Sequence, residues 1–185
     1  NQMQVKEVEC YYKNIIDFKK YILLSTNFDI YQANTNPTEV ALIQYAKEFI
    51  NIKAKKLQEI PFTSDRKFMS NLYKINNKNY IFSKGGLDII LEKCSIIDKE
   101  YKLNLNHNIK KEIINKADSY AKNGRRIIAF AYKEISLNRG LKLIGPEDEN
   151  NLTFLGFATI IDPPRLETKD AVYNCKRAGI KPVML

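Results

Sequence analysis

Three short segments carry the side chains of this sequence that are best suited to chemistry. They hold an aromatic ring and a lysine at Phe62 and Lys67, a lysine followed by two glycines at 84–86, and a carboxylate at Glu39. An aromatic face can stack on a planar base, lysines can pair with phosphates, and glycines allow a ligand to approach the backbone closely. Together these residue types predict a nucleotide site.

The carboxylate lies at the start of a predicted helix. Asn36 is a preferred N-cap residue and Pro37 suits the first helical position, so we expect a helix from Pro37 with an apolar period that continues to Ile50. Glu39 then falls in the first helical turn, where a negative charge is favourable.

The other elements follow from apolar periodicity and turn residues. Strands are expected at 3–12 (with a bulge), 60–63, 69–75, 80–83, 126–132 and 152–161, and helices at 15–24, 87–94, 109–122 and 167–178. The Asn76–Asn77 pair favours a hairpin between two of these strands, and a polar stretch at 98–108 leads to the helix at 109–122. This order predicts an α+β fold with a mostly antiparallel sheet flanked by helices.

The bulk composition is that of a packed domain. The chain has 185 residues, 44% of them hydrophobic, and no apolar run approaches the roughly 18 residues of a membrane span. No signal peptide is visible, so a soluble chain is expected. Its three cysteines are widely spaced and it has one histidine, which argues against a zinc site and favours a reducing compartment.

The net charge of +9 leaves a second reading open. A basic surface is typical of modules that bind nucleic acid or acidic partners. The densest lysine run, at 53–56, has no interleaved aromatic residues of the kind that hold single strands. We therefore expect no nucleic-acid partner, and the alternative is a basic module that binds nucleic acid or acidic partners without specificity for a nucleotide.

The character of the chain changes after Asp162. Pro163 and Pro164 stop the preceding strand, and an amphipathic helix and an apolar strand at 180–185 follow. Because that strand would need a parallel neighbour, an incomplete helix-strand unit is expected here. The expected state is a monomer, or weak self-association through this C-terminal segment.

Six motifs occur in an order that identifies a family. They are NPTE at 36–39, PFTSDRK at 61–67 followed by MS at 69–70, KGG at 84–86, RIIAFAY at 126–132, TFLG at 153–156 and DPPR at 162–165. This series resembles the nucleotide-binding domain of P-type cation-transporting ATPases of the calcium-pump type. The resemblance runs nearly from end to end.

The resemblance implies ATP as the ligand and a role for each matched position. Phe62 would stack on the adenine, Glu39 would bond its amino group, and Lys84 would line the purine pocket. Lys67 and Arg126 would approach the phosphates. Ser64, Gly85 and Ile128 complete the implied site, with Ser64 standing where many calcium pumps have an arginine.

The resemblance also implies a context. Residues 1–8 would leave a phosphorylation domain, 9–161 would form the nucleotide-binding domain, and 162–185 would be a hinge and an incomplete phosphorylation-domain segment. The hinge residues are Asp162, Pro163, Pro164 and Arg165. The parent would be an ATP-driven membrane pump that uses Mg-ATP and forms an aspartyl phosphate, with this domain on the cytoplasmic face.

The partners implied are ATP and the parent's own phosphorylation and transmembrane domains. The chain itself would bind ATP without turnover and hold no metal tightly. Differences from the family pattern at Asn36, Ser64 and Leu87 leave one further alternative, a folded domain whose pocket no longer binds nucleotide.

Overall fold

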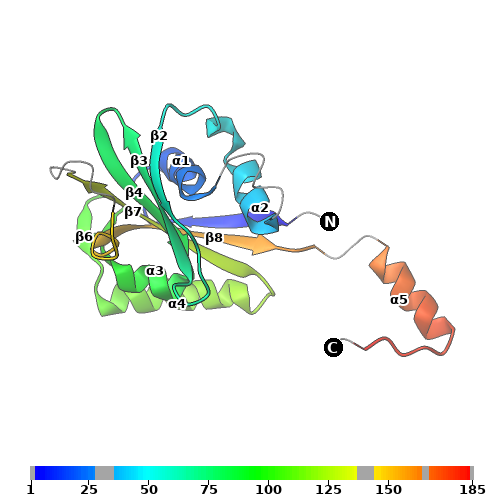
Figure 1. Cartoon of the computed structure of the whole chain (residues 1–185). Coiled ribbons are helices and arrows are strands. Elements are labelled where there is room, and N and C mark those ends of the chain that lie inside the picture. Colours follow the sequence, from blue (N-terminus) through cyan, green and yellow to red (C-terminus); the bar gives the residue numbers. More distant parts are fainter. Residues whose placement is uncertain (1–2, 28–35, 137–143, 164–166, 184–185) are drawn as a thin grey trace.

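The computed structural model describes residues 3–27, 36–136, 144–163 and 167–183, which form one sheet with helices on both faces (Figure 1). The strands are β1 Gln4–Cys10, β2 Lys55–Ile60, β3 Phe68–Ile75, β4 Lys78–Gly85, β5 Cys94–Asp98, β6 Lys102–Asn104, β7 Arg126–Ile135 and β8 Leu152–Ile161. The helices are α1 Ile15–Ser25, α2 Pro37–Tyr45, α3 Leu87–Lys93, α4 His107–Ala121 and α5 Thr168–Arg177, with a 3₁₀ turn η2 at Lys47–Phe49.

The sheet is antiparallel apart from one pairing. Within the described residues its order is β2-β3-β4-β7-β8-β5-β6, and β1 also pairs with β8. Only β5 and β8 run parallel among these strands. The predicted α+β fold with a mostly antiparallel sheet is therefore confirmed.

Two strands share one edge of β8, and a glycine marks their junction. β5 pairs with the first residues of β8, and β1 pairs from Gly156 onward. Gly156 has a φ of 141°, and a Cβ there would lie 2.0 Å from the carbonyl oxygen of Glu9. Only glycine fits this position, because any other side chain would push β1 off the edge.

The core lies on both faces of β7 and β8, as alternation along a strand requires. Ala129 and Ala131 pack with the cluster under α3 and α4, whereas Phe130 packs with the cluster under α1 and α2. The ring of Phe130 meets that of Phe18 edge-on, with 5.8 Å between the centroids. This packing fixes α1 and α2 on the face that holds the cavity described below.

Capping and turn residues predicted the positions of several elements correctly. The side chain of Asn36 accepts a hydrogen bond from the Thr38 amide, with Pro37 at the first helical position. Asn76 and Asn77 both have positive φ, 48° and 63°, as the tight turn of a hairpin requires. The expected bulge in β1 appears as a register shift between Val5 and Glu7.

Three expectations were wrong and one strand was not expected. The strand expected at 60–63 is β2, at Lys55–Ile60. The polar stretch 98–108 contains β6, which pairs with β5 and which the sequence did not predict. Helix α2 ends at Tyr45, because the Ala46 amide bonds both Leu42 and Ile43 and tightens the chain into η2. Residues 180–183 form no strand, since no neighbouring strand pairs with them in the described structure.

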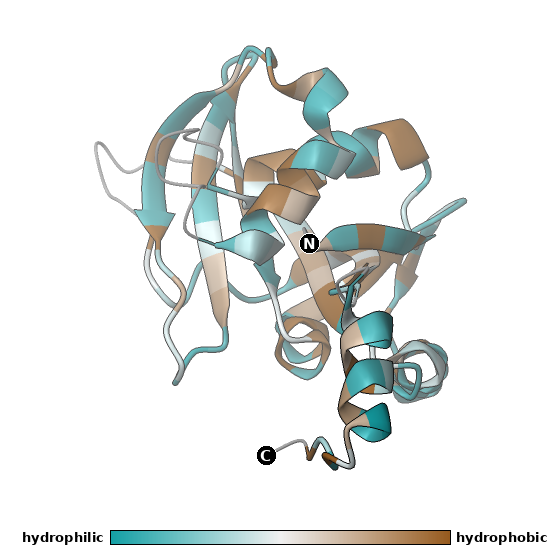
Figure 2. Ribbon diagram, turned by 90° about the vertical axis from the view of Figure 1, so that its right-hand side faces the viewer, coloured by the Kyte–Doolittle hydropathy of each residue, from teal (hydrophilic) through white to brown (hydrophobic). Residues whose placement is uncertain are grey.

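Helix α5 confirms the predicted amphipathic helix but contributes no buried residue. It stands apart from the sheet in Figure 1, and its ribbon is coloured largely as hydrophilic in Figure 2. Pro164 and Arg165 of the predicted hinge lie outside the described residues, and the division into 1–8, 9–161 and 162–185 stays a prediction. No described helix has the length and apolar character needed to cross a membrane.

Candidate functional site

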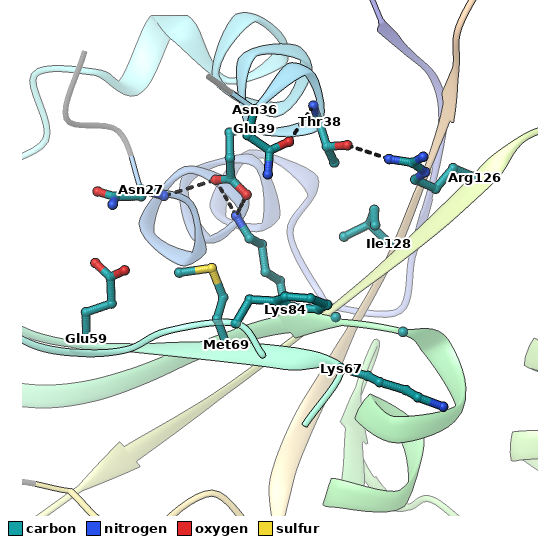
Figure 3. A pocket seen from close by; sticks show the side chains of 13 residues that line it. Asn27, Asn36, Thr38, Glu39, Glu59, Lys67, Met69, Lys84, Arg126 and Ile128 are labelled. Atoms are coloured by element: carbon teal, nitrogen blue, oxygen red, sulfur yellow. Dashed lines mark hydrogen bonds and ion pairs between the residues drawn. The ribbon is translucent and has the colours of Figure 1, made fainter. Parts of the chain in front are cut away.

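A cavity of about 910 Å³ lies between α2 and the strands β3, β4 and β7 (Figure 3). It is lined by Asn27, Asn36, Thr38, Glu39, Glu59, Phe62, Lys67, Met69, Lys84, Gly85, Gly86, Arg126 and Ile128. Seven of the eight predicted site residues are among them: Glu39, Phe62, Lys67, Lys84, Gly85, Arg126 and Ile128. The fold thus brings together residues that are almost 90 positions apart in sequence.

A buried ion pair forms the floor of this cavity. Lys84 extends from β4, a strand flanked by β3 and β7, and only 5% of it is exposed. Its ammonium donates to both carboxylate oxygens of Glu39, which projects from the first turn of α2. The backbone N–H of Asn27 also donates to Glu39, at 3.1 Å. The Glu39 carboxylate is therefore held by Lys84 of β4 and by the backbone just after α1.

Burial lowers the pKa of the Lys84 ammonium, and the charge and hydrogen bonds of Glu39 oppose that effect. Desolvation disfavours the charged form of a lysine, while a nearby carboxylate favours it. Here desolvation is the larger cause. The pair consequently places hydrogen-bond donors and acceptors where their desolvation is costly. A ligand with complementary groups gains the most binding free energy at such a position.

Gly85 allows the end of β4 to lie against the start of β3. A Cβ on Gly85 would lie 2.4 Å from the Cβ of Phe68 and 2.5 Å from the carbonyl oxygen of Lys67. The amide of Gly86 donates to that same carbonyl at 3.1 Å. Lys67 has a φ of 58°, so the chain turns sharply where it meets β4. This close approach requires glycine at position 85, whereas a Cβ on Gly86 would lie 4.0 Å from the Lys67 carbonyl oxygen.

The segment 61–67, here named the aromatic loop, carries Phe62 to the cavity. The Phe62 ring is 57% exposed, unusual for a phenylalanine, and it lines the cavity. Ser64 lies in the exposed turn of the same loop and is not among the residues that line the cavity. The loop closes on itself through a bond from the Lys67 amide to the Thr63 carbonyl, at 2.8 Å.

Arg126 lies at the first position of β7, at the far side of the cavity from Glu59 (Figure 3). Its guanidinium donates to the hydroxyl of Thr38 at 2.9 Å, and Thr38 belongs to the first turn of α2. Ile128, two positions along the strand, lines the cavity on the same face as Arg126. The arginine is thus held by the helix that also carries Glu39.

Sequence reasoning missed part of the lining. Thr38 stands beside Glu39 in the NPTE motif, so the motif could have indicated that it lies near the site. Its hydrogen bond with Arg126 could not be predicted from the sequence. Met69 follows the aromatic loop in the MS motif. Asn27 and Glu59 lie in segments with no motif, and only the fold brings them to the cavity.

The remaining predicted residues lie elsewhere. Asp162 and Pro163 follow the end of β8 and do not line the cavity. The described residues contain no group of three or more His, Cys, Asp or Glu placed to hold a metal ion.

The comparison with known families decides the identity of the fold. Residues 23–167 match the family described as "P-type ATPase, cytoplasmic domain N". The chain belongs to this family. The resemblance drawn from the six motifs is therefore confirmed, and the cavity lies in the N domain of a P-type ATPase.

Named relatives agree with this assignment. The chain is 34% identical over 158 residues to "Calcium-transporting ATPase 1" of Bacillus cereus, covering 81% of this chain and 17% of the relative. It is 32% identical over 192 residues to "Probable cation-transporting P-type ATPase" of Mycoplasma genitalium, and the match covers 100% of this chain and 21% of the relative. It is 35% identical over 148 residues to "Sodium/potassium-transporting ATPase subunit alpha" of Hydra vulgaris, and that match covers 74% of this chain and 14% of the relative. The chain thus spans between 14% and 21% of the length of these relatives.

Proposed function

We propose that this N domain binds ATP in the cavity of about 910 Å³, with the base at the ion pair and the phosphates near Lys67 and Arg126. The observation that carries the proposal is an exposed aromatic ring, Phe62, on the wall of a cavity whose floor is a buried ion pair. Single exposed apolar side chains are common on protein surfaces, and Phe62 is distinguished by its place on the wall of a cavity that also holds a buried ion pair.

The base would be recognised by shape and by hydrogen bonds. Stacking on an aromatic side chain contributes about 1–3 kcal/mol for any base. Glu39 offers only acceptors and Lys84 only donors, so a base edge with a donor beside an acceptor fits them. Adenine presents such an edge, because its exocyclic amino group lies next to a ring nitrogen.

The phosphates would meet positive charge at the opposite side. Lys67 is exposed and forms no ion pair with any described residue, which leaves its ammonium available. Arg126 is held by Thr38 and presents a planar guanidinium. Mg²⁺ would arrive on the phosphate oxygens of ATP, where it neutralises charge.

The proposal extends to the longer protein that the relatives represent. There the N domain would deliver ATP to a phosphorylation domain, where a carboxylate forms the aspartyl phosphate, and the energy would drive cation transport. The domain described here would bind nucleotide without turnover. Affinity on the order of 0.1–10 mM is expected for the domain alone, about −3 to −5.5 kcal/mol.

The test is a calorimetric or NMR titration of ATP into three proteins. Phe62→Ala should weaken ATP binding about tenfold and leave the unfolding temperature unchanged, since the ring is exposed. Tyr101→Ala is the matched control, because Tyr101 is 64% exposed and does not line the cavity. It should bind ATP as the wild type does.

Two outcomes would contradict the proposal. Absence of saturable binding by the folded wild type would make the cavity nucleotide-silent. Binding that ignores Phe62 but weakens steeply with salt, for ATP and for heparin alike, would instead support a basic surface for polyanions.

A further inference from the structure

The aromatic loop has little to hold it in place. Of residues 61–67 only Arg66 is partly buried, and the others are exposed. Within the loop, two backbone amides bond to Thr63, one to its carbonyl and one to its hydroxyl. Such a segment would sample many conformations unless a contact outside it fixed its position.

Arg66 supplies such contacts at both ends of the aromatic loop. Its guanidinium donates to the carbonyl oxygen of Pro61 at 3.1 Å, just before Phe62. It also lies over the ring of Phe68, 4.3 Å from the centroid, just after the loop. One planar group therefore ties the two ends of the loop to each other.

The anchor for Arg66 is a buried carboxylate on another loop. Glu149 accepts two hydrogen bonds from Nη2 of Arg66, at 2.6 and 2.8 Å, and is only 2% exposed. Charge-assisted bonds of this kind are about twice as strong as neutral ones. Burial makes the pairing obligatory, because an unpaired buried carboxylate is costly.

The turn that carries Glu149 is itself fastened to the sheet and to a helix. Lys133 of β7 donates to the carbonyl oxygens of Asp148 at 3.3 Å and Asn150 at 2.8 Å. Lys93 of α3 donates to the side-chain oxygen of Asn150 at 3.0 Å. The carboxylate thus stands on a rigid support just before β8, and neither it nor Arg66 lines the cavity.

We propose that Arg66 and Glu149 form a positioning pair that holds the aromatic loop so that the Phe62 ring faces the cavity. For its effect on ligand binding this inference rests on the proposed function. The pair touches no ligand. It acts by holding the loop in one conformation before the ligand arrives, so that less conformational entropy is lost on binding. This is the usual gain from preorganisation.

The experiment measures binding of two ligands to five proteins: the wild type, Arg66→Lys, Phe62→Ala, the double variant and one control. Arg66→Lys keeps the positive charge but cannot form the two bonds to Glu149 together with the one to Pro61. We expect it to weaken ATP and adenosine by the same factor, about fivefold. Adenosine is the informative ligand because it carries no phosphate.

A double variant separates positioning from any other role. If Arg66 acts through the ring, Arg66→Lys should cost nothing further in a Phe62→Ala background. Arg177→Lys is the control, since Arg177 also lies over an aromatic ring, 5.9 Å from the centroid of Tyr173, and does not line the cavity. It should leave both affinities unchanged.

A second readout does not need a ligand. Amide hydrogen exchange at Arg66 and Lys67, the two loop amides that bond to Thr63, should accelerate at least tenfold in Arg66→Lys and in Glu149→Gln, while exchange within β4 stays slow. If the wild type binds no ATP but the exchange result holds, the proposed function fails and the positioning pair stands.

Three results would overturn the inference. One is a loss of affinity for ATP with none for adenosine, which would make Arg66 a phosphate contact. Another is an equal loss in the presence and absence of the Phe62 ring. The last is unchanged exchange in the aromatic loop of both variants.

Discussion

One face of β4 passes from an aromatic region to a charged one within five residues. Tyr80, Phe82 and Lys84 alternate along the strand and so share a face. Tyr80 and Phe82 line a smaller cavity of about 420 Å³ between α1 and the β3–β4 turn. Lys84 lines the cavity of about 910 Å³.

The two cavities differ in where their charges lie. In the smaller one, Phe82 packs against Tyr21 at 5.1 Å between centroids and against Tyr80 at 6.1 Å. Its ion pair, Asp17 with Lys20 at 2.9 Å, is partly exposed at the rim. In the larger cavity the ion pair is buried beneath the opening and the aromatic ring is exposed, the inverse of what packing alone favours.

This difference supports the proposal that the larger cavity binds a ligand. Apolar rings under a solvated ion pair form an ordinary satellite of the core. A buried pair is often no more stable than an apolar replacement, so its presence needs another reason. Under the proposed function, ligand recognition would supply that reason for Glu39 and Lys84, and variants can test it.

The largest expected effect is on the buried pair. Glu39→Gln should lower the free energy of unfolding by about 3 kcal/mol at pH 7, because it leaves the Lys84 ammonium buried without its partner. Urea denaturation measures this loss. Glu39→Gln combined with Lys84→Met should recover part of the stability while ATP binding is lost. The larger cavity would then resemble the smaller one in having no buried ion pair.

The pH dependence of Glu39→Gln has a definite sign. Glu39 supplies the two largest causes that raise the pKa of Lys84, so removing it moves that pKa further below the ordinary value of 10.5. Between the lowered pKa and 10.5 the unfolded chain binds the proton that the folded one has released, so stability rises with pH. The deficit should therefore be smaller at pH 9.5 than at pH 7. An equal deficit at both would contradict the account of the pair.

The next effect concerns the aromatic region at alkaline pH. Burial raises the pKa of Tyr73 above its ordinary value of 10, and only 2% of this residue is exposed. Its contribution to stability is complete below pH 10 and is lost as the pH rises through the raised pKa. Stability should fall by about 1.4 kcal/mol per pH unit above 10 for this tyrosine.

Urea denaturation from pH 9 to 11 tests this slope with two variants. Tyr73→Phe should flatten the slope above pH 10, whereas Tyr101→Phe, at an exposed position, should not. The same slope in Tyr73→Phe as in the wild type would show that other groups control the alkaline transition.

The smallest effects compare one exposed lysine from each cavity. Lys67→Gln should weaken ATP about threefold at low salt and leave adenosine unchanged, because an exposed point charge acts only on the phosphates. Lys53→Gln, which removes a lysine that lines the smaller cavity, should change neither affinity. Titration at 20 and 200 mM salt distinguishes them. Equal losses would mean that net charge, rather than position, attracts ATP.

Much of the fold was predictable because its signals are local. An asparagine before Pro37 marked the start of α2, and Asn76–Asn77 marked the hairpin, since both act through bonds within a few residues. β2 was placed too late because it is an edge strand whose lysines and glutamate hide the alternation. β6 is short and fully exposed, so it left no apolar pattern.

The site was predictable only where motifs carried it. Phe62, Lys84 and Arg126 were found because each lies in a motif. The pairing of Arg66 with Glu149 joins residues 83 positions apart, and no periodicity or turn rule reports such a contact. Long-range pairs of this kind become visible only when the strands have been placed.

The junction at Gly156 has a consequence for how the domain is made. β1 pairs only with β8 in the described sheet, and the two are separated by roughly 150 residues, so closing them carries a large loop entropy. At about 5–20 residues per second, the ribosome releases β1 on the order of 10–30 s before β8 exists. During that interval β1 is an unpaired strand, and its charged residues Lys6, Glu7 and Glu9 disfavour pairing with another chain.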